Sequence, residues 1–310
     1  MQRTDMLRMD LTLNISLEHL RRHSLLNPRA QLATVKSNAI VPSFPMYVHD
    51  PSECKWISRS LLASGRFEAG LISTVVKVLA QNEGEWFLDI GANFGIYALS
   101  AAAAGFHTMA VEPLRYNTEL LAASAAHAGI GHRIVAFKTA VAADHSNEAM
   151  CVISHERTGN GNKGNGQLAP LSECTEAATS STPSSRSAAI ELVPVNTIDD
   201  LIASEADLSR ACFAAVKVDV EGFELPAMLG ARGVFGGKCP PCLVIVEYVP
   251  YYNVTLLAQS NQTRNPLPFL SSHGYRCRRG QSRHYRCDNL RVARCRPQRA
   301  GTIVPHDGHA

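Results

Sequence analysis

The sequence predicts an α/β protein whose core is a doubly wound, mostly parallel sheet with helices on both faces. Short apolar segments of strand length alternate with longer segments of helical periodicity, as in such a sheet. Hydrophobic residues make up 45% of the chain and charged residues 18%, which is typical of a globular protein with a full core. The 310 residues suffice for one large domain with appendages.

The first half of this pattern runs from residue 66 to residue 141. Apolar residues at helical spacing predict a helix that starts near Arg66 and ends before Gly84. Hydrophobic periodicity then predicts strands at 86–90, 107–111 and 133–141, with helices at 97–104 and 115–128. This order of elements indicates parallel strands with helical crossovers.

The alternation stops at about residue 156 and resumes after residue 189. The intervening segment is rich first in Gly and Asn and then in Ser and Thr, so it buries little apolar surface, and we expect a flexible surface insertion. Beyond it we predict strands at 190–195, 214–220 and 242–247 and helices at 197–204 and 224–231. The expected parts of the chain are a loosely structured lead-in (1–64), a main domain that contains the insertion (65–275) and an Arg- and Cys-rich C-terminal segment (276–310).

The C-terminal segment is strongly basic. Between Tyr275 and Arg299 there are nine arginines and a single acid, Asp288. Such a run is either a clamp for phosphate or nucleic acid or a solvated face, and we favour the solvated face because charge runs are usually solvated. The net charge of +3 is too small to predict a polyanionic partner.

Nine cysteines exclude complete disulfide pairing within one chain, because their number is odd. Cys239 and Cys242 have the spacing of a redox site or of half a zinc site. No second C-x-x-C follows them, and the pair precedes a predicted strand where a redox site of this kind would begin a helix. We therefore assign no metal to the functional site.

No apolar segment has the length of a membrane-spanning helix. The longest, at about 98–111, is interrupted by Ser100, Gly105 and His107 and is shorter than the ~18 residues that a span requires. Charged residues also interrupt the first ten residues, where a signal peptide would need an apolar core. We expect no transmembrane segment, and a cytoplasmic location is the default.

The most informative segment follows the first predicted strand and reads Asp89-Ile90-Gly91-Ala92-Asn93-Phe94-Gly95. Glycine in this turn lets the backbone approach a ligand closely, and the next helix presents free N–H groups to it. Glu112 follows 21 residues after Gly91, where a carboxylate can accept hydrogen bonds from a ribose diol. The pattern predicts a nucleoside ligand rather than a purely structural turn.

The spacing of the glycines selects among nucleosides. Dinucleotide-binding turns follow Gly-x-Gly-x-x-Gly, whose second glycine makes room for pyrophosphate, and Asn93 occupies that position here. S-adenosylmethionine has no phosphate, and its amino-acid end, adenosine and sulfonium suit a Gly-x-x-x-Gly turn with a flanking acid. The sequence therefore favours S-adenosylmethionine as cofactor.

Two further carboxylates, Asp219 and Glu221, follow the predicted strand 214–220. Ligands of open α/β sheets lie beyond the carboxyl ends of the strands, and the two residues share strand parity, so both can face one site. Helix capping by one or both acids explains the residues equally well at this point.

These segments together resemble the FkbM-type methyltransferases. The resemblance covers about 66–248 and rests on motifs in the family's order: Asp89–Gly95, Val111-Glu112-Pro113, Asn117, Thr197–Leu201 and Lys217–Glu224, followed by Leu229-Gly230-Ala231 and the strand ending in Glu247. It implies a class I, Rossmann-like methyltransferase fold with a seven-stranded sheet. It also implies O-methylation of a hydroxyl on a sugar, glycolipid or natural-product-like acceptor.

The resemblance also implies residue roles. It places Gly91, Ala92 and Asn93 around the methionine end of the cofactor and Glu112 on its ribose, with Asp89, Gly95, Pro113 and Asn117 in the same binding site. Asp219 and Glu221 are then expected at the methyl-transfer site, where a carboxylate would act as general base.

Two other functions remain open from the sequence. A nucleic-acid methyltransferase could use the basic C-terminal segment, but Val220-Glu221-Gly222-Phe223 stands where base-amine methyltransferases carry an Asn/Asp-Pro-Pro-aromatic turn. A non-catalytic binding protein could retain the fold, which the intact glycines and acids disfavour. A small-molecule or glycan partner is therefore expected.

Overall fold

The computed structural model describes most of the predicted domain and part of each flanking segment. The described residues are 8–9, 29–82, 84–144, 149–155, 166–172, 174–175, 188–248, 265–280, 283–292 and 295.

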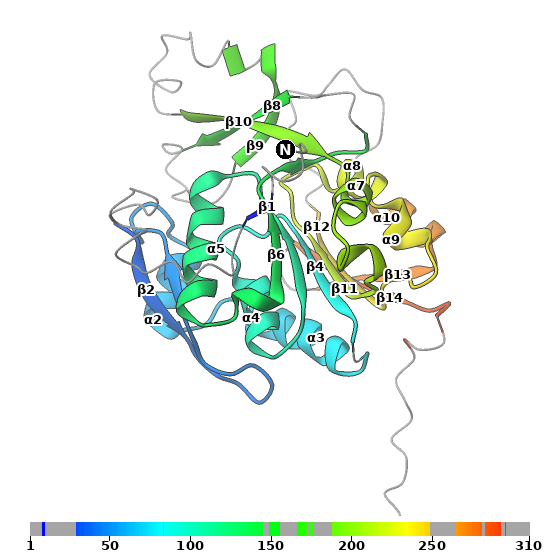
Figure 1. Ribbon diagram of the computed structural model, residues 1–310, viewed down its shortest axis with the longest axis horizontal. Coiled ribbons are helices and arrows are strands. Elements are labelled where there is room, and N and C mark those ends of the chain that lie inside the picture. Colours follow the sequence, from blue (N-terminus) through cyan, green and yellow to red (C-terminus); the bar gives the residue numbers. More distant parts are fainter. Residues whose placement is uncertain are drawn as a thin grey trace, which may run out of the picture.

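The core is one large sheet in the strand order β1-β6-β5-β4-β11-β12-β14-β13 (Figure 1). Its seven principal strands are β4 (Trp86–Ile90), β5 (Thr108–Val111), β6 (Ile134–Phe137), β11 (Phe213–Val218), β12 (Leu243–Glu247), β13 (Tyr275–Arg279) and β14 (His284–Asn289). The five strands from β6 to β12 run parallel, and β14 runs antiparallel to both of its neighbours. This sheet confirms the predicted fold class, and the two-residue β1 (Arg8–Met9) extends it by an eighth strand.

Helices cover both faces of the sheet (Figure 1). One face packs against α3 (Ala69–Ala80), α4 (Ile96–Ala103) and α5 (Arg115–His127), the other against α7 (Ile198–Ala203), α8 (Glu224–Leu229), α9 (Arg232–Gly236) and α10 (Leu267–Ser272). Side chains along β4 point alternately to the two faces. Phe87 packs in the hydrophobic cluster on the side of α3 to α5, while Leu88 and Ile90 pack in the cluster on the side of α7 to α10. Burial on both faces explains why the strands read as continuous apolar runs.

The described part of the lead-in is ordered and belongs to the core. It forms a hairpin of β2 (Gln31–Val35) and β3 (Phe44–Val48), followed by α2 (Ile57–Ser64). Phe44, Met46 and Val48 alternate along β3 and are buried in the same cluster as α3 to α5, and Tyr47 N donates to Ser124 Oγ of α5 (2.9 Å). The prolines around β3 had suggested a loose segment, but an edge strand tolerates proline.

A second, four-stranded sheet lies at one end of the main sheet (Figure 1). Its strands are β7 (Ala140–Val141), β10 (Ala188–Asn196), β8 (Ala149–His155) and β9 (Gly166–Pro170), in that order, and we call it the cap sheet. The predicted strand 133–141 is thereby split, because β6 belongs to the main sheet and β7 to the cap. Of the expected insertion, 156–165, 173 and 176–187 lie outside the described residues, while 166–170 and 188–189 form strands.

The main sheet continues past residue 275, where the sequence pattern placed a boundary. Strands β13 and β14 come from the expected C-terminal segment and close one edge of the sheet. Their apolar side chains face the core: Tyr275 and Cys287 are buried, while Arg276, Arg278 and Arg286 are exposed. This alternation was obscured in the sequence because arginine occupies the solvent-facing positions.

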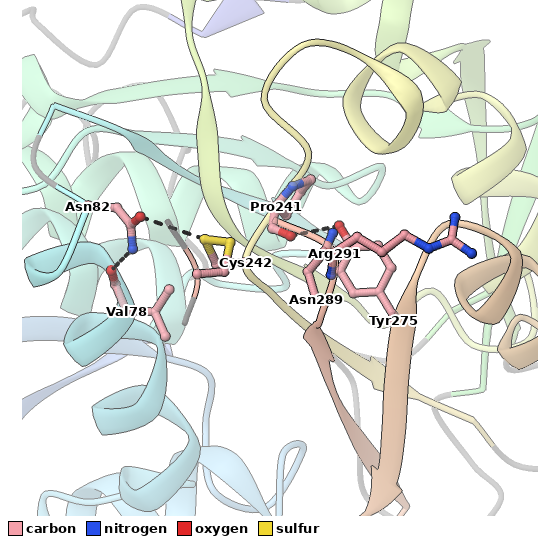
Figure 2. Close-up of a disulfide and its surroundings, with 8 residues drawn as sticks. Val78, Asn82, Pro241, Cys242, Tyr275, Asn289 and Arg291 are labelled. Carbon is pink, nitrogen blue, oxygen red and sulfur yellow. Dashed lines mark hydrogen bonds between the residues drawn. A yellow bond between two sulfur atoms is a disulfide. The ribbon is translucent and has the colours of Figure 1, made fainter. Parts of the chain in front are cut away.

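Four disulfides join the described cysteines: Cys151–Cys174, Cys212–Cys239, Cys242–Cys295 and Cys277–Cys287. Cys54 is buried and takes part in none of these disulfides. The C-x-x-C cysteines therefore pair with different partners and do not form a shared site. Figure 2 shows how Cys242 is held, with Asn82 beside its sulfur at 3.6 Å and the hydroxyl of Tyr275 donating to the neighbouring Pro241 carbonyl at 2.8 Å.

Removing the bond between Cys212 and Cys239 should destabilise the fold. The bond links the start of β11 to the segment before β12, across a sequence separation of 27. We therefore expect the double variant Cys212→Ala/Cys239→Ala to lose about 2–4 kcal/mol of unfolding free energy. Guanidinium denaturation measures this difference. The wild type and the variant should become nearly equal in reductant, and a difference that persists there would contradict a stabilising role for the bond.

Candidate active site

A cavity of about 700 Å³ opens at the carboxyl ends of the parallel strands. The turns that follow β4, β5 and β11, the end of β12 and the start of β14 line it, together with residues of the cap sheet. Five of the predicted cofactor residues line this cavity, namely Gly91, Ala92, Asn93, Glu112 and Pro113, and so do Asp219 and Glu221.

Gly91 allows the turn after β4 to touch the end of β11. Its φ is 79°, and a Cβ atom there would lie 1.9 Å from the backbone oxygen of Asp219. Only glycine fits this contact, because it combines a left-handed backbone with the absence of a side chain. The contact brings the two predicted halves of the site together.

Glu112 is tied into this turn by three hydrogen bonds. Its carboxylate accepts from Asn93 N (2.9 Å), Leu114 N (3.1 Å) and Asn117 Nδ2 (2.9 Å). Burial raises the pKa of Glu112 to about 7, and these three hydrogen bonds only partly offset the effect. The residue therefore shapes the cofactor turn as well as facing the cavity.

Three predicted cofactor residues lie behind the cavity rather than in its wall. Asn117 is fully buried, with its Oδ1 2.8 Å from His49 Nε2. Asp89 is also fully buried, and its Oδ2 accepts from Ala98 N at 3.1 Å. Gly95 precedes α4 with φ 92°, and a Cβ there would meet Leu121 Cγ at 2.8 Å. These three residues support the turn from behind.

The acidic end of the cavity contains groups to which the sequence pattern gave no role. Lys217, Glu247 and His284 line it beside Asp219, and Lys217 Nζ donates to Asp219 Oδ2 at 2.9 Å. Lys217 lies on β11, two residues before Asp219, and side chains two residues apart along a strand point to the same face. This spacing could have identified Lys217 from the sequence. His284 could not be found in this way, because it lies in the segment taken for a solvated tail.

Asp219 and Glu247 share a hydrogen bond and have opposite pKa shifts. Burial alone would raise the pKa of Asp219, but the Lys217 ammonium and the hydrogen bonds from Glu247 and Lys217 outweigh it and hold this pKa below its ordinary value. Burial, together with repulsion from Asp219, raises the pKa of Glu247 to about 9. At neutral pH the pair therefore shares one proton.

Backbone strain concentrates at this cavity. Among the described residues, Glu68, Asn93 and Glu221 are the non-glycine residues with positive φ, at 44°, 54° and 51°. All three line the cavity. Because such conformations cost free energy and cluster at functional sites, they mark the cavity independently of its charges.

The opposite end of the cavity is apolar. Val141, Val152, Gly166 and Leu168 of the cap sheet line it, together with Leu114, which follows β5 of the main sheet. Leu114, Val152 and Leu168 also belong to the small hydrophobic cluster that holds the cap in place. The cavity thus combines an acidic pole with an apolar pole.

Comparison with known proteins identifies the family. A model of the methyltransferase FkbM domain matches residues 89–277, which is more than half of the chain. This protein belongs to the FkbM methyltransferase family. No curated protein matches the chain.

FkbM methyltransferases use S-adenosylmethionine, and the lining of the cavity fits this cofactor. The cofactor carries a sulfonium and an ammonium, which suit the acidic pole, and an adenine, which suits the apolar pole. Among the described lining residues only Lys217 and Arg283 are permanent cations, and Lys217 is paired with Asp219. The described lining therefore contains no cluster of cations that would favour a pyrophosphate.

In the part of the methyltransferase that the structure describes, no helix is long and apolar enough to cross a membrane.

The buried carboxyl groups should make the cofactor-free methyltransferase less stable as pH rises. Burial raises the pKa of Asp89 to about 6 and those of Glu112 and Glu224 to about 7. The folded state therefore keeps protons that the unfolded state has released, so stability is full below the ordinary carboxyl pKa of 3.8 to 4.5. Each group then loses up to ~1.4 kcal/mol per pH unit until its folded pKa is reached.

We expect the melting temperature to fall between pH 5 and pH 7.5, as measured by calorimetry. Glu224→Gln should reduce this fall, because the amide does not titrate, whereas the exposed Asp207→Asn should leave it unchanged. A melting temperature that is flat or rises over this range would show that the carboxyls are not held protonated.

Proposed function

We propose that this methyltransferase transfers the methyl group of S-adenosylmethionine to a hydroxyl of a small or glycan-like acceptor. The observation that carries the proposal is that Asp219 and Glu221 line the same cavity as the cofactor turn. Carboxylates suit a hydroxyl acceptor, because an alcohol is a poor nucleophile unless its proton leaves as the new bond forms.

The cavity residues divide into two groups under this proposal. Gly91, Ala92 and Asn93 would hold the methionine end of the cofactor and Glu112 its ribose, while the apolar pole of the cavity would hold the adenine. When bound, the cofactor supplies an electrophilic methyl group on a sulfonium. The protein's main contribution is then positioning, which keeps the acceptor oxygen ~3 Å from that methyl carbon and in line with the sulfur.

We assign proton removal to Glu221 and positioning to Asp219. The Asp219 carboxylate is bound by Lys217 and Glu247, and both interactions reduce its basicity. Glu221 lies in the turn after β11, with a left-handed backbone that sets the direction of its side chain. A carboxylate so placed can take the proton from the acceptor and release it to water at the cavity mouth.

The test is a transfer assay with cofactor that is isotopically labelled in its methyl group. Sugars, glycolipids and polyols are compared with amines and RNA as acceptors. We expect label on oxygen, with kcat reduced about 10²- to 10⁴-fold in Glu221→Gln while the Kd for the cofactor is unchanged. Asp207→Asn, on an exposed turn away from the cavity, is the matched control. Label found only on nitrogen, or only on RNA, would show that the acceptor assignment is wrong.

A further inference from the structure

Asp219, Glu247 and His284 are brought together by the register of three neighbouring strands. Glu247 is the last residue of β12 and lies directly opposite His284, the first residue of β14. Asp219 immediately follows Val218, which pairs with Val246. One ligand atom from each of the three side chains lies within 4.8 Å of the others. The sheet itself therefore fixes this cluster, and mobile loops are not needed to assemble it.

The donor chemistry of the cluster suits a divalent cation. Two carboxylates and an imidazole are the ligands that hard and intermediate metal ions take in proteins. Atoms that bind one octahedral ion at ~2.1 Å lie about 3 Å apart when adjacent and about 4.2 Å apart when opposite, so atoms at the outer limit of 4.8 Å would have to approach by up to roughly 2 Å. Such a shift is within the reach of side-chain rotation.

A second layer supports the imidazole. Glu68 Oε1 lies 3.6 Å from His284 Nε2, and the Tyr97 hydroxyl donates to Glu68 Oε2 at 2.7 Å. Metal-binding histidines are commonly oriented by a carboxylate that is itself hydrogen-bonded. His284 is only 5% exposed, so packing holds its ring at the wall of the cavity, with the Glu68 carboxylate beside it.

The charge balance also favours a cation. Glu68 and Glu221 line the cavity together with Asp219 and Glu247, and the permanent cations of the described lining are Lys217, which pairs with Asp219, and Arg283. Lys217 donates to Oδ2 of Asp219, and a carboxylate has lone pairs for a second partner. Two carboxylates in contact need a shared proton or a metal ion between them, and an ion would take the place of that proton.

We propose that Asp219, Glu247 and His284 form a binding site for one Mg²⁺ or Mn²⁺ ion within the cavity. The predominance of carboxylate oxygen over nitrogen, and the absence of a thiolate from the cluster, favour these ions over Zn²⁺. The role of the ion rests on the proposed function: bound beside the transfer site, it would hold the acceptor hydroxyl and lower its pKa, so that Glu221 can remove the proton.

Metal binding is tested on the full-length protein without cofactor or acceptor. Chelator-treated protein is titrated with Mn²⁺ and the free ion is followed by electron paramagnetic resonance. We expect one ion per chain, and at least about tenfold weaker binding in Glu247→Gln and in His284→Gln. Asp288→Asn is the matched control, because it removes a partly exposed acid from the same strand, β14, that does not line the cavity.

The inference is overturned if the wild type binds no Mn²⁺ at millimolar concentration, or if both variants bind it as the wild type does. Circular dichroism establishes that each variant is folded. Failure here is distinguishable from failure of the proposed function, since a protein that needs no ion would still transfer methyl groups to hydroxyls in the presence of chelator. If methyl transfer requires the ion, chelator should abolish the transfer and leave the Kd for the cofactor unchanged.

Discussion

Gly91→Ala is expected to abolish measurable binding of S-adenosylmethionine and to destabilise the fold by about 2–5 kcal/mol. The added Cβ would lie 1.9 Å from the backbone oxygen of Asp219, and the φ of 79° is unfavourable for alanine. Relief requires the turn after β4 to move away from β11, which separates the cofactor turn from the transfer site. Isothermal titration calorimetry and guanidinium denaturation measure the two effects.

Gly129→Ala distinguishes the effect of the close contact at Gly91 from the effect of the left-handed backbone. Gly129 follows α5 with a φ of 70°, but among the described residues, its chain neighbours apart, no atom lies within 4 Å of the position that its Cβ would occupy. This variant carries only the backbone penalty, about 1–2 kcal/mol, and should bind the cofactor as the wild type does. Equal losses of stability in the two variants would show that Gly91 does not form the close contact.

Glu112→Ala is expected to weaken cofactor binding at least 100-fold, equivalent to about 2.7 kcal/mol or more. The change removes the carboxylate proposed to hold the ribose. It also leaves the N–H groups of Asn93 and Leu114 and the amide of Asn117 without their acceptor, and each such buried donor costs about 1–3 kcal/mol. Calorimetric titration with S-adenosylmethionine measures the loss of binding.

Glu119→Ala is the matched control for this change. Glu119 lies on α5 outside the cavity, where its partly buried carboxylate pairs with the exposed Arg115. Its cofactor affinity should equal that of the wild type. Unchanged affinity in Glu112→Ala, or preference of the wild type for NAD, would contradict the assigned cofactor site.

The parallel core of the fold was predictable because its strands are buried on both faces. Each apolar run from Trp86 to Glu247 could be recognised without knowledge of its partners, and the strand 86–90 was predicted with the bounds that β4 has. The last two strands were not predictable, because only one of their faces is apolar and arginine fills the other. Strands β8 and β9 of the cap sheet were missed because the polar segments beside them dominate the composition, whereas 190–195 of β10 was predicted as a strand.

The candidate site was predictable where its residues share a turn and obscure where they come from separate strands. Asp89 to Gly95 and Glu112 form a spacing pattern that physical chemistry can interpret directly. Glu247 and His284 meet only through the pairing of β12 with β14, and nothing in their spacing predicts that pairing. Asn117 was predicted to belong to the cofactor site, and it contacts Glu112 from behind the cavity, in a position that depends on the packing of α5.

The disulfides bear on where the methyltransferase can mature. The cytosol keeps protein thiols reduced, whereas secretory organelles and the periplasm form and maintain such bonds. Cys277–Cys287 crosslinks the strand that carries His284, and Cys242–Cys295 anchors the start of β12. Expression in a reducing compartment would therefore leave the strands that carry the acidic pole of the cavity without their disulfide crosslinks. An oxidising compartment of the host is the appropriate source of the enzyme.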